Sequence, residues 1–298
     1  MDRTGFAPVA SRMRNGHSAT ELPAHAKAFI LDFLKISKMA DRLIFLGSGG
    51  SRVVVATQVV ATGGFIIQLG HHQIWIDPGP GALVRAKECK VRASDTDIIF
   101  CSHHHIDHSN DINAVIDAMT IGGIRQKGVL ISTKTTIEGA DDNGPILLNF
   151  YKKSLKETYP LAPGDSVKIG DLTFIATPTD HDCDAIGLRL ETPYGAIGFT
   201  SDTAYSPKLA EALKGCTILI ADVLRPGNEK WKTHMNSANV AELFKEAKPR
   251  IGIITAFGMK LLKANPAWEA RDIQKESNVT VYAAREGLKI DLKTLMVS

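Results

Sequence analysis

The sequence predicts an α+β protein in which two β-sheets pack face to face and helices cover the outside. Two observations lead to this fold class. Residues 43–101 contain several short apolar runs separated by turn-forming residues, which is typical of successive strands. From residue 209 onward, segments with helical spacing of apolar residues alternate with short apolar runs. A chain of 298 residues is long enough for one large domain with a full core.

The first half of the chain is expected to be rich in strands. Apolar and β-branched residues predominate in six segments, which are the expected strands: residues 43–46, 53–60, 65–69, 73–76, 98–101 and 129–132. The first of these ends in a glycine-rich turn at residues 47–50. Apolar residues recur at helical spacing over residues 112–121, so a helix is predicted there.

The second half continues the sheets and adds helices. The expected strands are residues 172–177, 185–190, 196–199, 217–221, 251–255, 279–283 and 288–290. The second and third of these are predicted to form a hairpin around Pro193-Tyr194-Gly195. Helical spacing predicts helices at residues 209–213 and 237–247.

The N-terminal segment differs from the rest of the chain. Its first part is polar and has no period, and a short amphipathic helix is expected to follow. We therefore predict an N-terminal extension over residues 1–38, in part helical, and a folded domain over residues 39–298. The extension is either a partner-binding arm or a poorly ordered leader.

Composition narrows the class of protein. The formal net charge of +3 is too small to indicate nucleic-acid binding, although it permits an anionic substrate. The 4 cysteines form no CxxC pair, so they indicate neither a cysteine zinc site nor a disulfide framework, and incidental thiols are expected. No apolar run approaches the roughly 18 residues of a membrane span. We expect a cytoplasmic protein without membrane contact.

A histidine cluster follows the predicted strand at residues 98–101. It has the pattern H-x-H-x-D-H, formed by His103, His105, Asp107 and His108. Neutral imidazole and carboxylate are the ligands that zinc takes in sites that stay open to water. One metal cannot collect all four side chains without strain, so His103 and His105 are assigned to one metal, and Asp107 and His108 to a second. The alternative is a solvated histidine-rich loop.

With this motif the chain resembles the metallo-β-lactamase superfamily, from about Arg42 onward. The resemblance implies a four-layer αββα sandwich with the metals at one edge. It implies that Asp77 orients a metal-bound histidine and does not bind metal itself. It assigns His181 as the third histidine of the first metal and Asp202 as the bridge between both metals. Taken alone, Asp202 would be an ordinary turn residue.

A further histidine indicates the branch of the superfamily. His234 precedes the predicted helix at residues 237–247. In the RNase Z-like phosphodiesterase branch, a similarly placed histidine protonates the leaving oxygen, and the resemblance implies this catalytic role for His234. Asp107 is the second candidate catalytic residue, as metal ligand and proton acceptor. The alternative for His234 is a helix-flanking residue without chemistry.

The chain departs from the family pattern at Ala256. Relatives are expected to have a histidine here, as the last ligand of the second metal, and a methyl group cannot coordinate metal. The second metal would keep Asp107, His108 and Asp202. Ala256 is therefore predicted to disable the enzyme. Two origins stay open: a deliberate substitution, or a natural variant with one metal.

These residues together predict a metal-dependent hydrolase with two zinc ions per active site, or manganese in their place. The expected substrate is a small phosphodiester, namely a nucleotide or a cyclic nucleotide. The alternatives are a tRNA 3′-processing endoribonuclease, for which RNA is the substrate, a lactonase or thioesterase, and a non-catalytic metal-binding protein. No basic arm suited to gripping tRNA is found, which favours the small substrate. A homodimer is expected.

Overall fold

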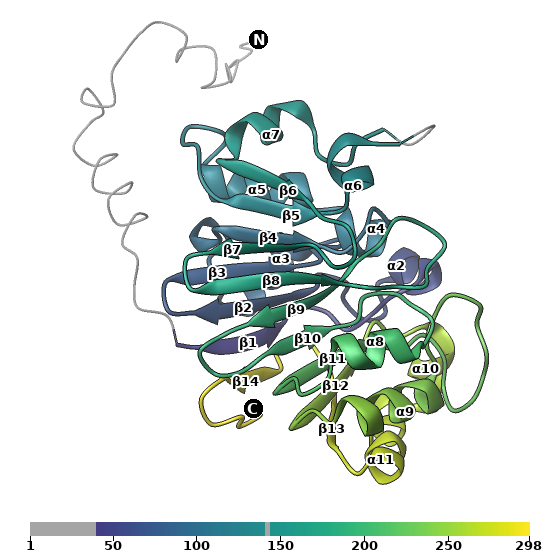
Figure 1. Ribbon diagram of the computed structural model, residues 1–298. Coiled ribbons are helices and arrows are strands. Elements are labelled where there is room, and N and C mark those ends of the chain that lie inside the picture. The colour runs from purple at the N-terminus through teal and green to yellow at the C-terminus, as the bar shows by residue number, and fades with distance from the viewer. Residues whose placement is uncertain (1–39, 141–143) are drawn as a thin grey trace, which may run out of the picture. The chain divides into compact units, whose positions relative to one another are not determined.

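The computed structural model describes residues 40–140 and 144–298. The predicted N-terminal extension, residues 1–38, lies outside the described residues, so its partly helical character stays a prediction. The described chain forms two mixed β-sheets that face each other, with helices outside them (Figure 1). The α+β sandwich predicted from the sequence is thereby confirmed.

The first sheet, as far as the described chain shows it, has seven strands in the order β14-β1-β2-β3-β4-β5-β6. Its strands are β1 (Arg42–Phe45), β2 (Phe65–Leu69), β3 (His72–Ile76), β4 (Ile98–Cys101), β5 (Val129–Ser132), β6 (Glu157–Pro160) and β14 (Lys289–Asp291). Strands β3 to β6 run parallel, whereas β14, β1, β2 and β3 pair antiparallel.

The second sheet repeats this plan, with seven strands within the described ranges in the order β13-β12-β11-β10-β9-β8-β7. Its strands are β7 (Ser166–Ile169), β8 (Leu172–Thr177), β9 (Gly187–Glu191), β10 (Ile197–Phe199), β11 (Ile218–Asp222), β12 (Ile251–Thr255) and β13 (Thr280–Ala283). Strands β10 to β13 are parallel, and β7 to β10 are antiparallel. The predicted hairpin is the antiparallel pair β9 and β10.

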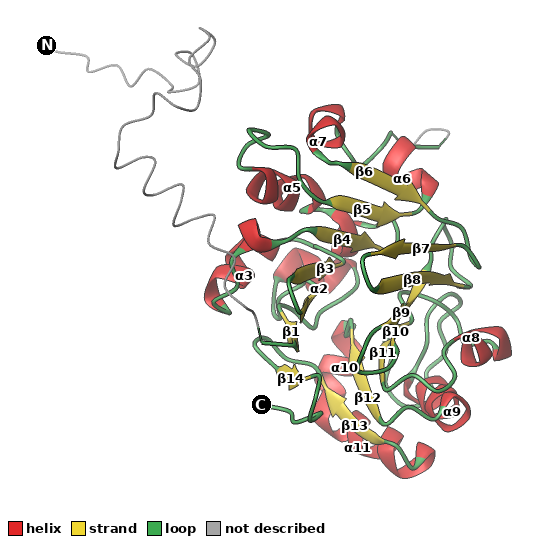
Figure 2. Ribbon diagram, turned by 60° about the vertical axis from the view of Figure 1, so that its left-hand side comes forward, coloured by secondary structure: helices red, strands yellow, loops and turns green. Residues whose placement is uncertain are grey.

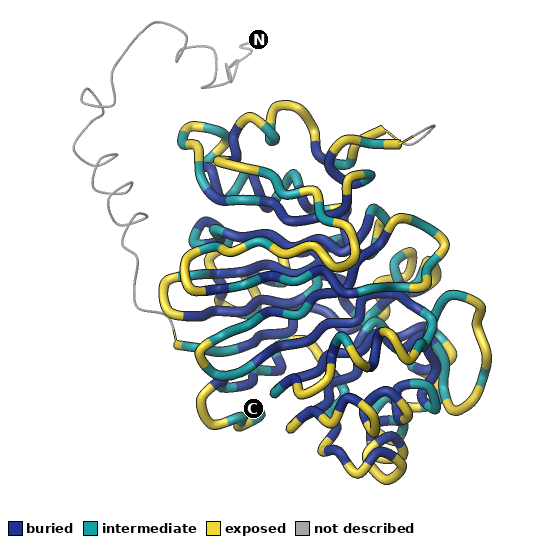
Figure 3. Tube along the Cα trace, in the orientation of Figure 1, coloured by how far each residue is buried: buried dark blue, intermediate teal, exposed yellow. Residues whose placement is uncertain are grey.

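The main core lies between the two sheets. Successive side chains of a strand point to opposite faces, and in β1 Leu43 and Phe45 belong to the core between the sheets, whereas Ile44 belongs to the core under the outer helices. Both faces are therefore buried, which explains why the central strands are continuously apolar in sequence. Figure 3 shows these central strands buried along their length.

Helices cover the outer faces of the sheets (Figures 1 and 2). Apolar residues of α3 (Ala82–Glu88) and α5 (Ile112–Thr120) pack on the first sheet, and those of α8 (Pro207–Ala212), α9 (Ser237–Ala247) and α11 (Pro266–Ser277) pack on the second. The smaller helices are α2 (Arg52–Thr57), α4 (Ile106–Ser109), α6 (Lys134–Glu138), α7 (Asn149–Ser154), α10 (Met259–Ala264) and the 3-10 turn η3 (Ala93–Asp95). Within the described ranges, no helix is both long and apolar enough to span a bilayer.

The prediction of a strand at residues 53–60 is wrong, because residues 52–57 form α2. The valines there suit a strand by propensity, but only Val54 of this helix is buried, and Val53 and Val59 are exposed. A strand would need one face against the core. Instead, the backbone N–H of Ser51 donates to Asp107 Oδ2 at 2.8 Å and starts the helix beside the histidine loop.

Several other elements are not predicted by the sequence pattern. Strands β6 and β7 lie at the edges of their sheets, and their residues are only partly buried or exposed, so they lack a strong apolar signal. In α11 only Ala270, Ile273 and Ser277 are buried. The sequence pattern detects elements through buried apolar faces, and these elements have little of one.

The parallel strands bring the predicted site residues to one place. The carboxyl ends of parallel neighbours meet at the same edge of a sheet. In the first sheet, β3 ends just before Asp77 and β4 just before the histidine motif. In the second sheet, β10 ends just before Asp202 and β12 just before Ala256.

Candidate metal centre

The histidine motif owes its shape to one short helical turn. Strand β4 is buried throughout and delivers the chain to His103. The backbone N–H groups of His108 and Ser109 both donate to the carbonyl of His105 at 3.0 Å, which starts α4. This turn places Asp107 and His108 one after the other at its beginning, while His103 and His105 stay in the extended segment before it.

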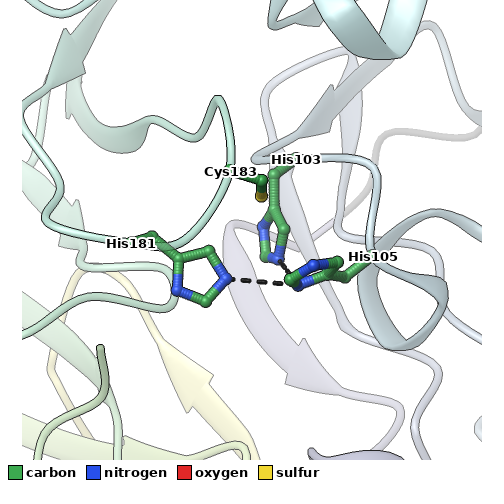
Figure 4. Close-up of side chains that lie close together, drawn as sticks. All are labelled: His103, His105, His181 and Cys183. Atoms are coloured by element: carbon green, nitrogen blue, oxygen red, sulfur yellow. Dashed lines mark hydrogen bonds between the residues drawn. The ribbon is translucent and has the colours of Figure 1, made fainter. Parts of the chain in front are cut away.

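Three histidines converge in a first cluster. The Nδ1 atom of His105 lies 3.0 Å from Nε2 of His103 and 3.2 Å from Nε2 of His181 (Figure 4). A single ring nitrogen carries at most one proton, so hydrogen bonding alone does not explain this convergence. Zinc–nitrogen bonds of about 2.0–2.1 Å in a tetrahedron give ligand separations of about 3.3 Å. The spacing of the three nitrogens therefore fits one zinc ion.

A second cluster forms around His108 and Asp202. The Nε2 atom of His108 is buried and lies 3.3 Å from Asp202 Oδ2 and 3.7 Å from Asp107 Oδ2. Its orientation gives it no hydrogen-bond partner among the described residues. A buried ring nitrogen that faces two carboxylates without a hydrogen bond is well suited to a metal ligand.

Asp77 occupies the supporting position that the sequence predicts. Its Oδ2 lies 2.7 Å from Nδ1 of His108 and also accepts the hydroxyl of Ser102, while its Oδ1 accepts the Ser102 backbone N–H. The carboxylate is therefore fixed by Ser102 and in turn orients the imidazole. A proton held on Nδ1 by Asp77 leaves the Nε2 lone pair of His108 directed at the second cluster.

His234 lies against the same carboxylate oxygen as His108. Its Nε2 is 3.3 Å from Asp202 Oδ2, and its Nδ1 is 3.1 Å from Thr233 Oγ1. His181, Asp202 and His234 have potential ligand atoms within 4.8 Å of one another. The structure thus places His234 next to Asp202 and His181, two of the residues that could hold a metal, and not merely beside a helix.

The electrostatics differ between the two clusters. Burial, reinforced by the neighbouring His108, holds the pKa of His103 well below its ordinary value, so this imidazole is neutral as a zinc ligand must be. Burial also lowers the pKa of His105. Burial opposes the charged form of His234 too, but the hydrogen bond and charge of Asp202 outweigh it and raise the pKa of His234. His234 therefore holds its proton more readily than His103 or His105 does.

Ala256 lies at the edge of the second cluster. It lines a cavity of about 30 Å³ together with Asp107, His108 and Asp222. Its φ angle is 54°, in the left-handed region that a β-carbon disfavours but that histidine adopts more often than most residues. Both the position and the backbone conformation are therefore compatible with a histidine.

Sequence reasoning missed two side chains of the centre. Asp222, the last residue of β11, is buried, and neither of its carboxylate oxygens has a hydrogen-bond partner in the described ranges. Burial and the nearby charge of Asp202 raise the pKa of Asp222 well above its ordinary value. Cys183 has its sulfur beside the three histidines of the first cluster. An acid that ends a buried strand, and a thiol two residues after His181, are the signals that could have drawn attention to them.

All residues predicted for the centre are thus close together, and the donor set fits zinc. The first cluster offers three imidazoles, and the second offers carboxylates with one imidazole. Both sets are ligands that zinc takes in catalytic sites. The side chains that the sequence analysis assigns to the two metal positions therefore lie side by side at one edge of the sheets.

Comparison with known proteins shows that the sequence is similar to a known family and to proteins of other organisms. Residues 72–255 match the family described as "Beta-lactamase superfamily domain". An uncharacterized protein of Methanocaldococcus jannaschii is 39% identical over 257 residues, which cover 85% of this chain and 96% of that protein. A ribonuclease Z of Methanopyrus kandleri is 22% identical over 285 residues, covering 84% of this chain and 97% of the relative.

A solved structure agrees with the observed fold. The metallo-beta-lactamase fold protein YhfI from Bacillus subtilis superposes with a TM-score of 0.71 at 19% identity, covering 83% of this chain and 98% of that chain. The ribonuclease Z relative agrees with the predicted RNase Z-like resemblance. Because the family match spans more than half of the sequence and the fold is the same, the chain belongs to the β-lactamase superfamily of metal-dependent hydrolases.

Proposed function

We propose that this chain has the active site of a phosphodiesterase for a nucleotide or cyclic nucleotide, and that Ala256 disables it. His103, His105 and His181 would hold the first metal. Asp107 and His108 would hold the second, with Asp202 between both. Zinc is the expected metal and manganese the alternative. Metal bound there would acidify water and neutralise phosphate charge.

The observation that carries this proposal is a pocket of about 340 Å³ beside His234. Lys230 and Lys232 line it, and they suit the negative charge of a phosphate. Tyr205 and Trp231 line it as well, and their rings suit stacking with a nucleobase. The volume lies in the range of small-molecule sites. Cations and aromatic rings next to a protonatable histidine fit a nucleotide better than a lactone or a thioester.

His234 would supply the proton that the leaving group needs. Asp202 and Thr233 hold the ring by its two nitrogens, and the hydrogen bond and charge of Asp202 raise the pKa of His234, which favours its protonated form. Asp107 would accept a proton in addition to binding the second metal. Its Oδ2 already accepts the Ser51 N–H, which fixes the carboxylate before substrate arrives.

The second candidate is a non-catalytic metal-binding protein, and Ala256 is the observation that favours it. A tRNA-processing endoribonuclease remains an alternative, since a ribonuclease Z is among the relatives. It would require a gripping element for RNA, which the sequence does not indicate. These readings differ in their substrates, so a substrate panel separates them.

The test exploits the different needs of two leaving groups. p-Nitrophenolate departs without a proton, whereas the alkoxide of a nucleotide needs one. His234→Gln in an Ala256→His background should therefore slow the hydrolysis of cyclic nucleotides by about 100-fold or more, the range of general acid catalysis. The same change should slow bis-p-nitrophenyl phosphate much less.

A control variant and a substrate panel distinguish the proposed phosphodiesterase from the alternative functions. Lys208→Gln changes a lysine that does not line the pocket and should alter neither rate. Equal loss for both phosphodiesters would contradict a proton-donating His234. Cleavage of a tRNA precursor or a lactone in preference to every nucleotide would replace the proposed substrate.

A further inference from the structure

Trp231 is a large, exposed aromatic side chain beside the candidate metal centre. It lies in the loop between β11 and α9, and 51% of it is exposed, although tryptophan is on average a highly buried residue. It lines the pocket of about 340 Å³ that His234 also lines. A wide ring exposed at a pocket wall is typical of a ligand contact.

One face of this ring is already covered. The guanidinium carbon of Arg225 lies 4.3 Å from the centroid of the Trp231 ring, a cation–π contact that holds the indole in place. Arg225 is itself oriented by Glu229, with 3.4 Å between Nη1 and Oε1. Since half of the Trp231 side chain stays exposed, the opposite face of the ring is left for a planar ligand.

Tyr205, the second aromatic ring of the pocket, is held differently. It packs against the apolar cluster under α8, α9 and α11, so part of its surface is used by the core. Trp231 belongs to none of the apolar clusters that the described residues form. Trp231 is therefore the better placed of the two rings to stack with a ligand.

The turn that carries Trp231 also carries His234. These two residues pair as an isolated antiparallel bridge, with Lys232 and Thr233 between them. Residues directly opposite in an antiparallel pair carry their side chains on the same face, with Cβ atoms about 4.5–5.5 Å apart. The indole and the imidazole thus leave from adjacent positions on one wall of the pocket. A ribose can connect a base on the indole with a phosphate beside the imidazole.

Contacts with two neighbouring helices fix this loop before a ligand arrives. The backbone N–H of Gly227 donates to Oε2 of Glu269 in α11 at 2.8 Å. Oε1 of Glu229 lies 2.5 Å from Nζ of Lys260 in α10. The carbonyl of Glu229 accepts the side-chain amide of Asn236 at 3.3 Å. A loop held in this way loses little conformational freedom on binding, which favours affinity.

We propose that Trp231, backed by Arg225, is the base-binding platform of this centre and makes the site select purine nucleotides. The inference rests on the proposed function and narrows its substrate class. A purine offers more ring surface for stacking than a pyrimidine, and aromatic contact energy grows with the area buried. Lys230 and Lys232, on either side of Trp231 in sequence, would meet the phosphate charge.

Adenosine monophosphate and ribose 5-phosphate provide the direct test, because they share the sugar and the phosphate and differ in the base. The unaltered chain loaded with zinc should bind adenosine monophosphate at least about 5-fold more tightly than ribose 5-phosphate by calorimetry, with cytidine monophosphate between them. Trp231→Ala should weaken the binding of adenosine monophosphate by about 5- to 150-fold, the range of base–aromatic stacking, and leave ribose 5-phosphate unchanged. Trp268→Ala removes another exposed tryptophan, outside the pocket, and should change neither affinity.

A second variant guards against a folding defect. Trp231→Phe keeps an aromatic ring, so it should regain much of the affinity for adenosine monophosphate that the alanine variant loses. Equal weakening of both ligands in Trp231→Ala would refute a base-specific role, and tighter binding of cytidine monophosphate would refute purine selection.

Failure of this inference is distinguishable from failure of the proposed function. Equal affinity of the unaltered chain for adenosine monophosphate and ribose 5-phosphate would overturn the platform. It would leave the proposed phosphodiesterase intact, because hydrolysis of bis-p-nitrophenyl phosphate by Ala256→His tests that activity separately. Base-selective binding by a chain whose Ala256→His variant hydrolyses no phosphodiester would refute the proposed function and support the platform.

Discussion

Restoring a histidine at position 256 is the sharpest perturbation that the structure offers. The left-handed backbone at Ala256, with φ of 54°, already suits histidine. The new imidazole would enter the cavity that Asp107 and His108 line. One ring nitrogen would reach the second metal position, and the other would face the carboxylate of Asp222, which has no hydrogen-bond partner among residues 40–140 and 144–298.

The expected gain in rate follows from how accurately the second metal is held in position. A metal displaced by about 1 Å costs on the order of 100-fold in rate, and outright loss of the metal costs more. Ala256→His should therefore raise kcat/KM by about 100-fold or more, which corresponds to about 2.7 kcal/mol of barrier. The cavity of about 30 Å³ holds little more than one water molecule. The metal-free variant should therefore lose about 1–3 kcal/mol of stability through overpacking.

The assay compares the unaltered chain with Ala256→His on bis-p-nitrophenyl phosphate and cyclic nucleotides, at saturating zinc and at saturating manganese. Zinc content by elemental analysis should rise from one to two ions per chain in the variant. Ala256→Gly is the matched control. It relieves the left-handed strain of about 1 kcal/mol without adding a ligand, so it should leave activity unchanged.

Equal rates for the unaltered chain and Ala256→His would mean that position 256 is no ligand position. The two-metal mechanism and the disabled-enzyme reading would then both be refuted. A similar gain in Ala256→Gly would show that backbone strain, and not coordination, limits activity.

Three further predictions concern other parts of the molecule. Asp77→Asn should weaken zinc binding by about 10–100-fold, because His108 loses the carboxylate that orients it. Chelator competition measures this affinity, and an unchanged value would contradict the role of Asp77. The hydrogen bond to Asp97, at 2.6 Å, outweighs burial and raises the pKa of His72. The pair therefore stabilises the folded chain fully below the unfolded pKa of about 6.5, and this stabilisation is lost as the pH rises through the higher folded pKa. The melting-temperature difference between the unaltered chain and His72→Gln should thus shrink from about pH 6 to about pH 9, and a constant difference would contradict the pairing. A chain that begins at Met39 should retain its zinc, because every proposed ligand follows that residue, and a metal-free product would show that residues 1–38 support the centre.

The sequence by itself determined most of the strands and the local metal motif. Strands such as β4 and β11 are buried on both faces, so continuous apolar runs marked them without reference to the rest of the fold. The spacing of His103, His105, Asp107 and His108 was readable because all four lie in one short segment after one strand. Asp77, His181, Asp202 and His234 were assigned through their order in the resemblance, since no local signal distinguishes them from turn or loop residues.

Only the tertiary structure decided which side chains from the two sheets lie close together at their shared edge. Residues 52–57 became α2 because contact with Asp107 and solvent exposure of the valines outweighed their strand propensity. Cys183 and Asp222 gained their meaning only when the loops after separate strands met at one edge. Sequence periodicity reports burial over a few residues, whereas a metal centre depends on distances between residues far apart in the chain. Those distances are set by how the two sheets pack, which the pattern of one sequence does not encode residue by residue.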